Sequence, residues 1–294
     1  MGVSTVAVVG CGMMGRGIME VSAVAGLKVK GIKQTPGDLQ APRDKIANSL
    51  ARRVKKGKLT QAQADEVLAR IELTSDLSAV ADADMVVESV VEVEETKVEL
   101  LAKLEEHMHP EAVLGSNTSS LRLEVISKKL KRPENFVGLH FFSPVPAMAL
   151  VELGAIKQTA EFALAKVNDF CAQIGKTVVT VQSSPGYVVN RLLVPFLLHG
   201  IETLESGIAS AQDIDEAMKL GCNHPLGPLA LSDLIGLDVV RAMAETLGRE
   251  LGDSRYKMPA TLVKLTDENQ LGRKTGIGIY DYSGDEPVLN KALA

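Results

Sequence analysis

Several residue types are scarce in this chain of 294 residues. It contains no tryptophan and only 3% aromatic residues, and its three cysteines, Cys11, Cys171 and Cys222, are far apart. An odd number of cysteines at such spacing forms neither a disulfide framework nor a paired zinc motif, so we expect no metal site and a reducing, cytoplasmic compartment. Basic residues are not in excess either, and the net charge of -5 gives no reason to expect a nucleic-acid partner.

Long apolar runs are also missing. The most apolar helical segment, residues 188–204, contains Asn190, Arg191, Pro195 and His199, and it is too short and too polar to span a bilayer. The first residues do not form the basic and apolar regions of a secretory leader. With 46% apolar and 23% charged residues, the composition is that of a globular protein. We therefore expect a soluble chain of two domains without a membrane partner.

Short apolar runs alternate with helical segments as far as Val181. Buried strands are predicted at residues 5–9, 29–32, 85–88, 112–115, 136–140, 150–153 and 177–181. Helices are predicted at residues 13–25, at 43–70 with a break at Gly57, and at 94–107, 121–130 and 161–174. This alternation predicts an α/β fold with a Rossmann-like, mainly parallel sheet that helices cover on both faces.

The pattern changes at a turn-rich break formed by Ser183, Ser184, Pro185 and Gly186. Beyond the break only helices are predicted, followed by a loose tail at residues 285–294. We therefore divide the chain into a first domain at residues 1–184 and an all-helical C-terminal domain at residues 185–294.

A glycine-rich loop links the first predicted strand to the first predicted helix. Gly10, Gly12 and Gly15, with Met13 and Met14 before the last of them, complete the pattern G-x-G-x-x-G of dinucleotide-binding domains. The first glycine permits a tight turn, the second lets the backbone approach the pyrophosphate, and the third lets helix and strand pack closely. A chance glycine-rich turn is the alternative, but the place between strand and helix favours a site for NAD or NADP in the domain at residues 1–184.

One element of the dinucleotide pattern is missing. Many NAD-binding domains carry an Asp or Glu at the end of the second strand, where it binds the adenosine ribose. Residues 31–35 contain no acid, and Lys33 lies near the expected position. A lysine there removes the repulsion of a 2′-phosphate and adds an attractive charge, so NADP is slightly favoured over NAD. Alternatively, Lys33 points to solvent while backbone groups and Gln34 hold the ribose of NAD.

Motifs in both domains resemble those of one enzyme family. They are GSNTSS at residues 115–120, HFFSP at 140–144, LVE at 150–152, PGYVVNR at 185–191, NHPLGP at 223–228, LIGLD at 234–238 and LGRKTG at 271–276. In this order and spacing they resemble the 3-hydroxyacyl-CoA dehydrogenases, with the bacterial 3-hydroxybutyryl-CoA dehydrogenases as the most similar branch. The resemblance implies that the C-terminal domain serves substrate binding and dimerisation, so a homodimer is expected.

The resemblance also implies the reaction, in which a short 3-hydroxyacyl thioester and its 3-oxoacyl form interconvert by hydride transfer with NAD(P). Oxidation of a secondary alcohol needs a base near neutral pH, and histidine is the usual one. Of five histidines, His140 ends a predicted strand at the edge where such sheets bind ligands. A role in the core is the alternative for His140, and the resemblance selects catalysis. His199, within an apolar helix, is expected to serve packing.

Three further residues complete the implied catalytic set. Glu152 lies in an apolar run, where a carboxylate is costly unless it is paired. The resemblance makes it the partner that orients His140, and the alternative is an edge residue that reaches solvent. Ser119 and Asn190 match residues that bind the reacting hydroxyl or carbonyl, with a helix N-cap and a buried polar helix residue as alternatives. Because Asn190 follows the break, the substrate is expected between the domains.

Other residues match cofactor and substrate contacts of the family. Glu92 and Lys97 match positions that contact the nicotinamide half of the cofactor, and Asn117 is carried over as a cofactor contact in the same way. Ser49 and Lys56 match positions that contact the CoA part of the substrate. The basic residues around Lys56 suit phosphate recognition or, equally, a solvated helix face.

Other functions remain open from the sequence. Ser143 stands where the family commonly has Asn, which is compatible with a hydroxyacyl group carried by an acyl carrier protein, as in polyketide pathways. A hydroxy-acid dehydrogenase without a thioester is a further alternative, as is a non-catalytic relative similar to eye-lens crystallins. The complete set of Ser119, His140, Glu152 and Asn190 argues against lost catalysis.

Overall fold

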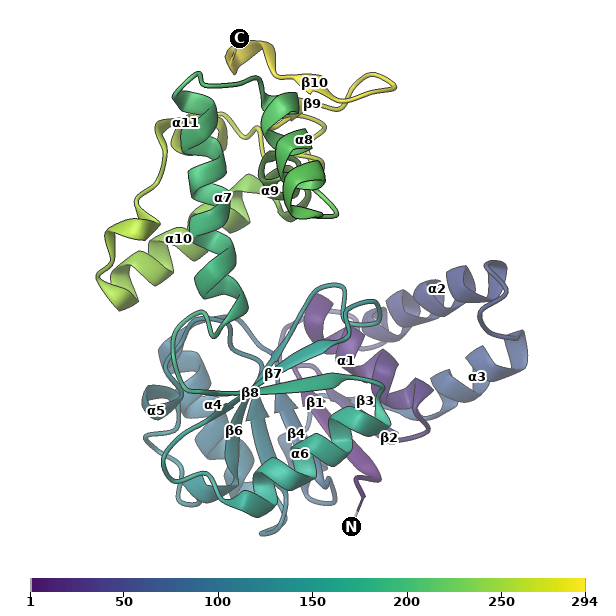
Figure 1. Cartoon of the computed structure of the whole chain (residues 1–294). Helices are drawn as coiled ribbons and strands as arrows, with labels where there is room; N and C mark the ends of the chain where they lie inside the picture. The colour runs from purple at the N-terminus through teal and green to yellow at the C-terminus, as the bar shows by residue number, and fades with distance from the viewer. Residues whose placement is uncertain (1, 294) are drawn as a thin grey trace. The chain divides into compact units, whose positions relative to one another are not determined.

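The computed structural model describes residues 2–293, which form two compact units. The first unit ends at Tyr187 and the second begins at Val188 (Figure 1). Each unit has a hydrophobic core of its own. None of the helices in this part of the chain has the length and apolar content that a membrane crossing requires.

The first unit is built on an eight-stranded sheet of order β3-β2-β1-β4-β5-β6-β7-β8. The strands are β1 (Thr5–Val9), β2 (Lys28–Ile32), β3 (Ile71–Thr74), β4 (Met85–Glu88), β5 (Val113–Ser116), β6 (Phe136–Phe141), β7 (Leu150–Ala155) and β8 (Thr177–Gln182). All neighbours pair in parallel except β6 and β7, which are antiparallel. The predicted Rossmann-like, mainly parallel sheet is confirmed.

Helices cover both faces of this sheet. They are α1 (Met13–Val24), α2 (Ala41–Lys55), α3 (Gln61–Ala69), α4 (Glu94–His107), α5 (Leu123–Ile126) and α6 (Glu161–Gln173), with short 3-10 helices η1 (Leu77–Val80) and η2 (Pro133–Asn135). One core lies between the sheet and α1, α2, α3 and α6, and a second lies between the opposite face and α4 and α5. Alternate side chains of each strand therefore enter different cores.

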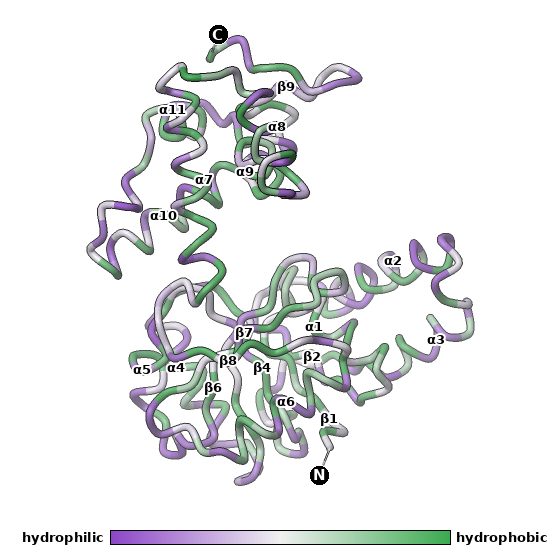
Figure 2. Tube along the Cα trace, viewed as in Figure 1, coloured by the Kyte–Doolittle hydropathy of each residue, from purple (hydrophilic) through white to green (hydrophobic). Residues whose placement is uncertain are grey.

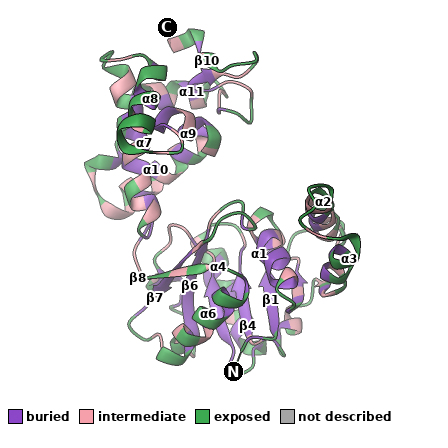
Figure 3. Cartoon of the chain, turned by 45° about the vertical axis from the view of Figure 1, so that its right-hand side comes forward, coloured by how far each residue is buried: buried purple, intermediate pink, exposed green. Residues whose placement is uncertain are grey.

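Three predictions for this unit were wrong. β3 was missed because its four residues directly follow a helical pattern and include a charged Glu72. β8 is not a buried strand: it forms the edge of the sheet, and Val179 on it is exposed (Figure 3). The helix predicted at 121–130 is shorter than expected and consists only of α5. It begins after Arg122 because the backbone of this residue is extended, and further along the chain the backbone N–H groups of Lys131 and Arg132 bind Glu105 instead of continuing a helix.

The helices α2 and α3 pack against each other as a pair joined at Gly57, where the backbone enters the left-handed region (φ 68°). The predicted break at Gly57 is therefore confirmed. A capping box between Thr60 and Gln63 begins α3. Many residues of α2 are hydrophilic, in contrast to the strands of the sheet (Figure 2).

The second unit is mainly helical. It contains α7 (Val189–Glu205), α8 (Ala211–Cys222), α9 (Pro228–Ile235), α10 (Leu237–Leu251), α11 (Ala260–Asp267), η3 (Ser254–Tyr256), η4 (Lys291–Leu293) and the short strands β9 (Tyr280–Asp281) and β10 (Val288–Leu289). The buried Asp233 accepts hydrogen bonds from the backbone of Ile279 and Tyr280, which joins the last strands to α9.

The loose tail predicted at the C-terminus was wrong for residues 285–293. Asn290 is buried, and its side-chain amide donates to the Gln270 side chain (2.6 Å) and to the Gly278 carbonyl (2.7 Å). Composition alone did not indicate this order, because one buried asparagine holds a polar segment in place.

Candidate active site

His140 and Glu152 face each other across two neighbouring strands. Their strands β6 and β7 are antiparallel, and the two residues are direct partners in the register. Such partners place their side chains close together on one face of the sheet. Nδ1 of His140 lies 2.8 Å from Oε2 of Glu152, and the two residues are 6% and 0% exposed. The solvent-exposed alternative for Glu152 is therefore wrong.

This pair can work as a base held by an acid. An ionised carboxylate only accepts hydrogen bonds, so it selects the imidazole tautomer that carries its proton on Nδ1. Nε2 is then the nitrogen that remains to exchange a proton. When the ring becomes positively charged, the carboxylate stabilises it, because burial strengthens the attraction between the two charges.

Glu92 holds the loop that carries Ser119. Its Oε1 accepts hydrogen bonds from the Thr118 hydroxyl (2.6 Å), the Ser119 backbone (2.9 Å) and the Ser120 backbone (3.1 Å). Burial alone would raise the pKa of Glu92, but the charge of Lys97 and these hydrogen bonds hold it below its usual value. Ser119 is not a helix N-cap, because Arg122 occupies that position before α5.

Lys97 lies beneath Glu92 in an ion-pair network. Its ammonium is 2.7 Å from Glu88 and 3.3 Å from Glu92, and the side chains of Lys97 and Glu88 have no exposed surface. Ser116 and the backbone of Val90 also donate to Glu88, at 2.5 and 2.6 Å. The structure therefore does not place Lys97 where a cofactor can contact it. Of its two acidic partners, Glu92 is the one whose side chain is partly exposed.

Asn117 ties together the carboxyl ends of three strands. Its side-chain oxygen accepts from the Phe141 backbone (3.0 Å), and its amide donates to the Ser89 hydroxyl (3.2 Å). Its own backbone N–H donates to the Glu88 carbonyl (2.7 Å). These contacts show how Asn117 fixes the sheet edge near the predicted cofactor site.

The glycine loop between β1 and α1 has the geometry that a dinucleotide needs. Gly10 has φ 101°, and a Cβ there would lie 2.4 Å from the Ser89 carbonyl oxygen. A Cβ on Gly15 would lie 1.8 Å from the Gly10 carbonyl oxygen, so loop and helix pack too closely for any side chain. A Cβ on Gly12 would meet no described atom within 4 Å, which leaves space for a phosphate before the N–H groups that begin α1. These three positions fit the pyrophosphate of a dinucleotide.

Three other residues of the glycine loop, Met13, Met14 and Cys11, carry no negative charge at neutral pH. Met13 is 68% exposed at the start of α1, and Met14 packs against the core. Burial raises the pKa of the Cys11 thiol to about 11, although Lys33 and Arg16 oppose the shift. A neutral thiol at neutral pH does not repel a pyrophosphate.

Lys33 is the residue that directly follows β2. Its ammonium donates to the carbonyls of Thr35 (2.5 Å), Pro36 (2.7 Å) and Gly37 (3.4 Å), so it folds back over its own loop. The amide of Gln34 donates to the Ser75 carbonyl (3.3 Å). The strand end thus coincides with the position where the pattern has its ribose-binding acid.

The remaining predicted residues lie elsewhere. Ser49 is half-buried on α2, and Lys56 is exposed directly after it. Asn190 is 9% exposed in α7, within the second unit. His199 does not serve packing as predicted: its side chain is 63% exposed and lies 3.9 Å from Glu202.

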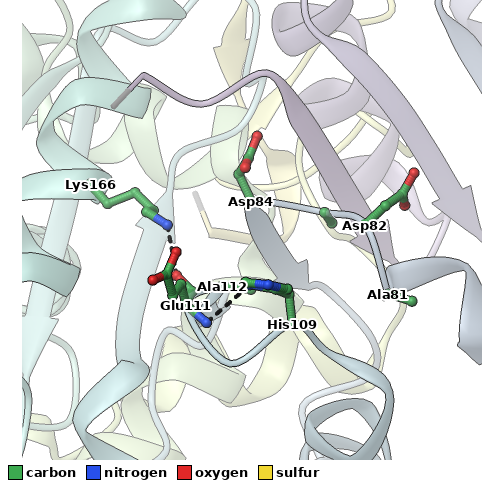
Figure 4. Close-up of a pocket in the computed structure, with 8 residues that line it drawn as sticks. Ala81, Asp82, Asp84, His109, Glu111, Ala112 and Lys166 are labelled. Carbon is green, nitrogen blue, oxygen red and sulfur yellow. Dashed lines mark hydrogen bonds between the residues drawn. The ribbon is translucent and has the colours of Figure 1, made fainter.

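A separate pocket lies at the opposite, amino edge of the sheet (Figure 4). It is lined by residues that precede β4 and β5 and by Lys166 of α6. Lys166 donates to the Glu111 carbonyl (2.7 Å), and Asp84 binds the backbone of Ser4 (2.7 Å). Because β6 and β7 place the dyad at the carboxyl edge, this pocket is not part of the candidate active site.

Sequence reasoning missed two residues of the site. Glu88 ends the apolar run MVVE, and its buried carboxylate is the same signal that identified Glu152. Tyr187 stacks on the ring of His140, with centroids 5.2 Å apart and planes 19° apart. No pattern along the chain pairs residues so distant in sequence.

A buried histidine–glutamate pair at the same sheet edge as a dinucleotide loop could supply the proton transfer that a dehydrogenase acting on alcohols needs. Comparison with known families gives the particular one. The family model described as the 3-hydroxyacyl-CoA dehydrogenase NAD binding domain matches residues 5–184, and the C-terminal domain model of the same family matches residues 186–282. The chain belongs to the 3-hydroxyacyl-CoA dehydrogenase family, which confirms the resemblance found in the sequence.

Individual relatives agree with this family. The chain is 42% identical over 282 residues to a 3-hydroxybutyryl-CoA dehydrogenase of Mycobacterium tuberculosis, covering 95% of this chain and 99% of that protein. It is 41% identical over 277 residues to the enzyme of the same name from Clostridioides difficile, covering 94% and 99%. The solved structure of (S)-3-hydroxybutyryl-CoA dehydrogenase PaaH1 from Ralstonia eutropha superposes with a TM-score of 0.90 at 41% identity, covering 96% and 100%.

Proposed function

We propose that this chain interconverts a short 3-hydroxyacyl-CoA, of the size of 3-hydroxybutyryl-CoA, and its 3-oxoacyl form. The observation that carries the proposal is the buried His140–Glu152 hydrogen bond of 2.8 Å at the carboxyl edge of the sheet. The names of the 3-hydroxybutyryl-CoA dehydrogenases that match nearly the whole chain support the acyl length, and the name of the Ralstonia eutropha enzyme supports the (S) configuration. The same names support CoA rather than an acyl carrier protein as the carrier.

The dyad performs the proton transfer. In the oxidative direction, Nε2 of His140 accepts the proton of the 3-hydroxyl while the hydride leaves C3, and Glu152 stabilises the resulting imidazolium. In the reductive direction, the imidazolium returns the proton to the 3-oxo oxygen. The nicotinamide ring, when bound, accepts or donates the hydride. Ser119 and Asn190 are proposed to bind the reacting oxygen, and Glu92 fixes the Ser119 loop for that task.

The cofactor is a nicotinamide dinucleotide, and we assign a preference for NADP to Lys33. This residue directly follows β2, where an acid would otherwise meet the 2′-hydroxyl of NAD. Its ammonium is bound by three backbone carbonyls that carry no net charge, so a 2′-phosphate can compete for it. With Gln34 bound to the Ser75 carbonyl, the NAD ribose has few side-chain partners in this loop.

The CoA part of the substrate is proposed to meet Ser49 and Lys56. Ser49 lies within α2, and Lys56 directly follows the last turn of this helix, which contains Arg52, Arg53 and Lys55. Arg53 is already paired with Glu20 at 3.5 Å, so Lys56 is the more available charge for a phosphate. The homodimer expected from the family resemblance is also retained as a proposal.

Replacement of His140 tests the proposed chemistry. The variant His140→Gln should lower kcat by roughly 10²–10⁴-fold, the usual contribution of general acid–base catalysis, with little change in cofactor affinity. Exchange of exposed His107 at the end of α4 for Gln is the matched control and should leave kcat unchanged. Near-normal turnover by folded His140→Gln would exclude His140 as the base.

A further inference from the structure

Two glycines face each other beside the dyad. Gly138 on β6 and Gly154 on β7 are register partners, as His140 and Glu152 are. Residues two apart on a strand share a face, so the glycine pair and the dyad lie on the same face of the sheet. A pair of glycines leaves this part of the sheet without side chains, and the resulting slot is filled from elsewhere.

Tyr187 fills the slot together with the side chain of Leu123. A Cβ on Gly138 would lie 2.3 Å from the Tyr187 hydroxyl oxygen, and a Cβ on Gly154 would lie 2.8 Å from its Cε1. Both distances are shorter than any real contact, so only glycine at the two positions admits the tyrosine ring where it lies. The ring is 4% exposed and stacks on the imidazole of His140.

The backbone around Tyr187 is built to hold this ring in place. Tyr187 itself has φ 46°, a left-handed conformation that is uncommon for a residue with a side chain. The preceding Gly186 has φ 77° and donates its N–H to the Ser119 carbonyl (3.1 Å), while the N–H of Tyr187 donates to the Ser184 carbonyl (3.0 Å). Strained backbone of this kind persists where the surroundings fix it, and it gathers at functional sites.

The hydroxyl of Tyr187 does not explain the arrangement. It is buried, and no described residue offers it a hydrogen bond. Burial raises the pKa of this hydroxyl, and the nearby Glu92, Glu152 and Glu124 raise it further, so it stays neutral. A buried hydroxyl without a partner destabilises a fold. The feature that the site uses is therefore the flat ring.

We propose that Tyr187 is a positioning residue that fixes the plane of the His140 imidazole through ring stacking. This inference rests on the proposed role of His140 as the base. The Glu152 hydrogen bond limits the last side-chain torsion, which is broad for histidine, but a single hydrogen bond still tolerates some rotation of the ring. Tyr187 on one side and Phe142, with its centroid at 4.4 Å, restrict that rotation and so aim Nε2.

Two variants of Tyr187 separate the ring from the hydroxyl. Tyr187→Phe keeps the ring and should retain kcat within about twofold, whereas Tyr187→Leu should lower kcat by roughly 10–100-fold, since small misplacement of a catalytic group costs about that much. KM for the thioester and for the nicotinamide should change little in both. Full activity of Tyr187→Leu, or an equal loss in Tyr187→Phe, would overturn the proposal.

The His140→Gln variant serves to distinguish a role of Tyr187 in positioning His140 from a role in folding. In His140→Gln there is no base to aim, so adding Tyr187→Leu should cause no further loss of kcat. A loss of the same factor in both backgrounds would mean that Tyr187 acts on the fold alone. Phe136→Leu, which removes a fully buried ring from β6, is the control and should affect stability without lowering kcat.

A third variant moves the ring without removing it. Gly154→Ala places a methyl group against Tyr187 (2.8 Å) and Leu123 (2.9 Å) and should lower kcat, and Gly154→Ala combined with Tyr187→Leu should recover the part of the loss that comes from the displaced ring. If Tyr187→Leu does not fold, Gly154→Ala alone decides, and unchanged kcat there overturns the proposal. Normal turnover of His140→Gln would instead remove the proposed function on which the inference rests.

Discussion

At the scale of single residues, buried carboxylates organise this site. Glu88 and Glu152 both end or interrupt apolar strands, and both have 0% exposure. A buried charge is tolerated only with partners, which are Lys97 and Ser116 for Glu88 and His140 for Glu152. Each carboxylate therefore fixes a neighbour: Glu88 holds Lys97 under Glu92, and Glu152 holds the ring of His140, the proposed base.

If Glu152 acts through His140, the losses of kcat caused by replacing the two residues should not be additive. Residues that act as one unit do not contribute separate factors, so the loss of kcat in Glu152→Gln combined with His140→Gln should nearly equal the loss in His140→Gln alone. The measurement is kcat for the parent, both single variants and the double variant. A double loss equal to the product of the single losses would show that Glu152 acts independently.

The proposed preference for NADP over NAD depends on one residue, Lys33. Lys33→Asp should shift the ratio of kcat/KM for NADPH and NADH toward NADH by about tenfold or less, because an exposed ion pair contributes up to about 1 kcal/mol. The parent should favour NADPH. Lys28→Asp, an exposed change at the other end of β2, should leave the ratio unmoved. A parent that strongly favours NADH, with no response to Lys33→Asp, would remove Lys33 from the ribose site.

Some residues of the candidate site could be predicted from the sequence, and others could not. The glycine loop was predicted because each glycine answers a local steric demand. A carboxylate in an apolar strand indicated that Glu152 needs a partner, and the family resemblance made His140 that partner. Tyr187 could not be predicted, because its ring reaches His140 across 47 positions (187 less 140) and through a slot made by glycines of two strands. Lys97 resembled a surface charge in a Glu-rich helix, and only its pairing with Glu88 explains its burial.

At the scale of elements, the loop after β5 depends on one acid from the loop before α4. Glu92 binds Thr118, Ser119 and Ser120 and pairs with Lys97. The carboxyl ends of β4 and β5 are neighbours in the sheet, so one side chain can span both loops. This clamp gives Ser119 a fixed backbone although it lies outside any helix.

The clamp should give a pH-dependent contribution to stability. The pKa of Glu92 is lowered in the folded state, so its stabilisation is complete above its usual value of 4.5 and is lost as the pH falls through the lower folded pKa. Glu92→Gln should therefore reduce the free energy of unfolding at pH 7 by about 1–2 kcal/mol, and by less at acidic pH. Urea unfolding of both proteins at several pH values measures this.

A matched control separates the clamp from general loss of charge. Glu72→Gln removes an exposed acid from β3 and should change stability little at any pH. If Glu92→Gln destabilised the protein as strongly well below pH 4.5 as at neutral pH, the charged clamp would not be the source of the effect.

The elements themselves were largely predictable. The helices over residues 94–107 and 161–174 and most strands followed from apolar periodicity. The antiparallel pairing of β6 with β7, on which the dyad depends, was not predicted, because pairing direction depends on the connection through residues 142–149 rather than on the strands. The exposure of β8 likewise follows from its place at the edge of the sheet, which its own sequence does not indicate.

At the scale of the whole molecule, the segment before the second unit is hydrogen-bonded to the first unit beside the candidate active site. Ser183 accepts from the backbone of Leu123 (3.2 Å) and donates to Glu124 (2.8 Å), and Gly186 donates to Ser119. The turn-rich break read from the sequence is thus an ordered structure that ends in Tyr187. The two family models also meet within it, at residues 184 and 186.

The proposed 3-hydroxyacyl-CoA dehydrogenase activity is tested most directly with the whole chain and acetoacetyl-CoA. The oxidation of NADH and of NADPH is measured. Acetoacetate, the acyl carrier protein thioester and longer 3-oxoacyl-CoA substrates are assayed beside acetoacetyl-CoA. We expect rapid oxidation with acetoacetyl-CoA, much slower reaction with free acetoacetate, and loss of the activity in His140→Gln. No oxidation of either cofactor with any CoA thioester by the folded protein would contradict the proposed activity.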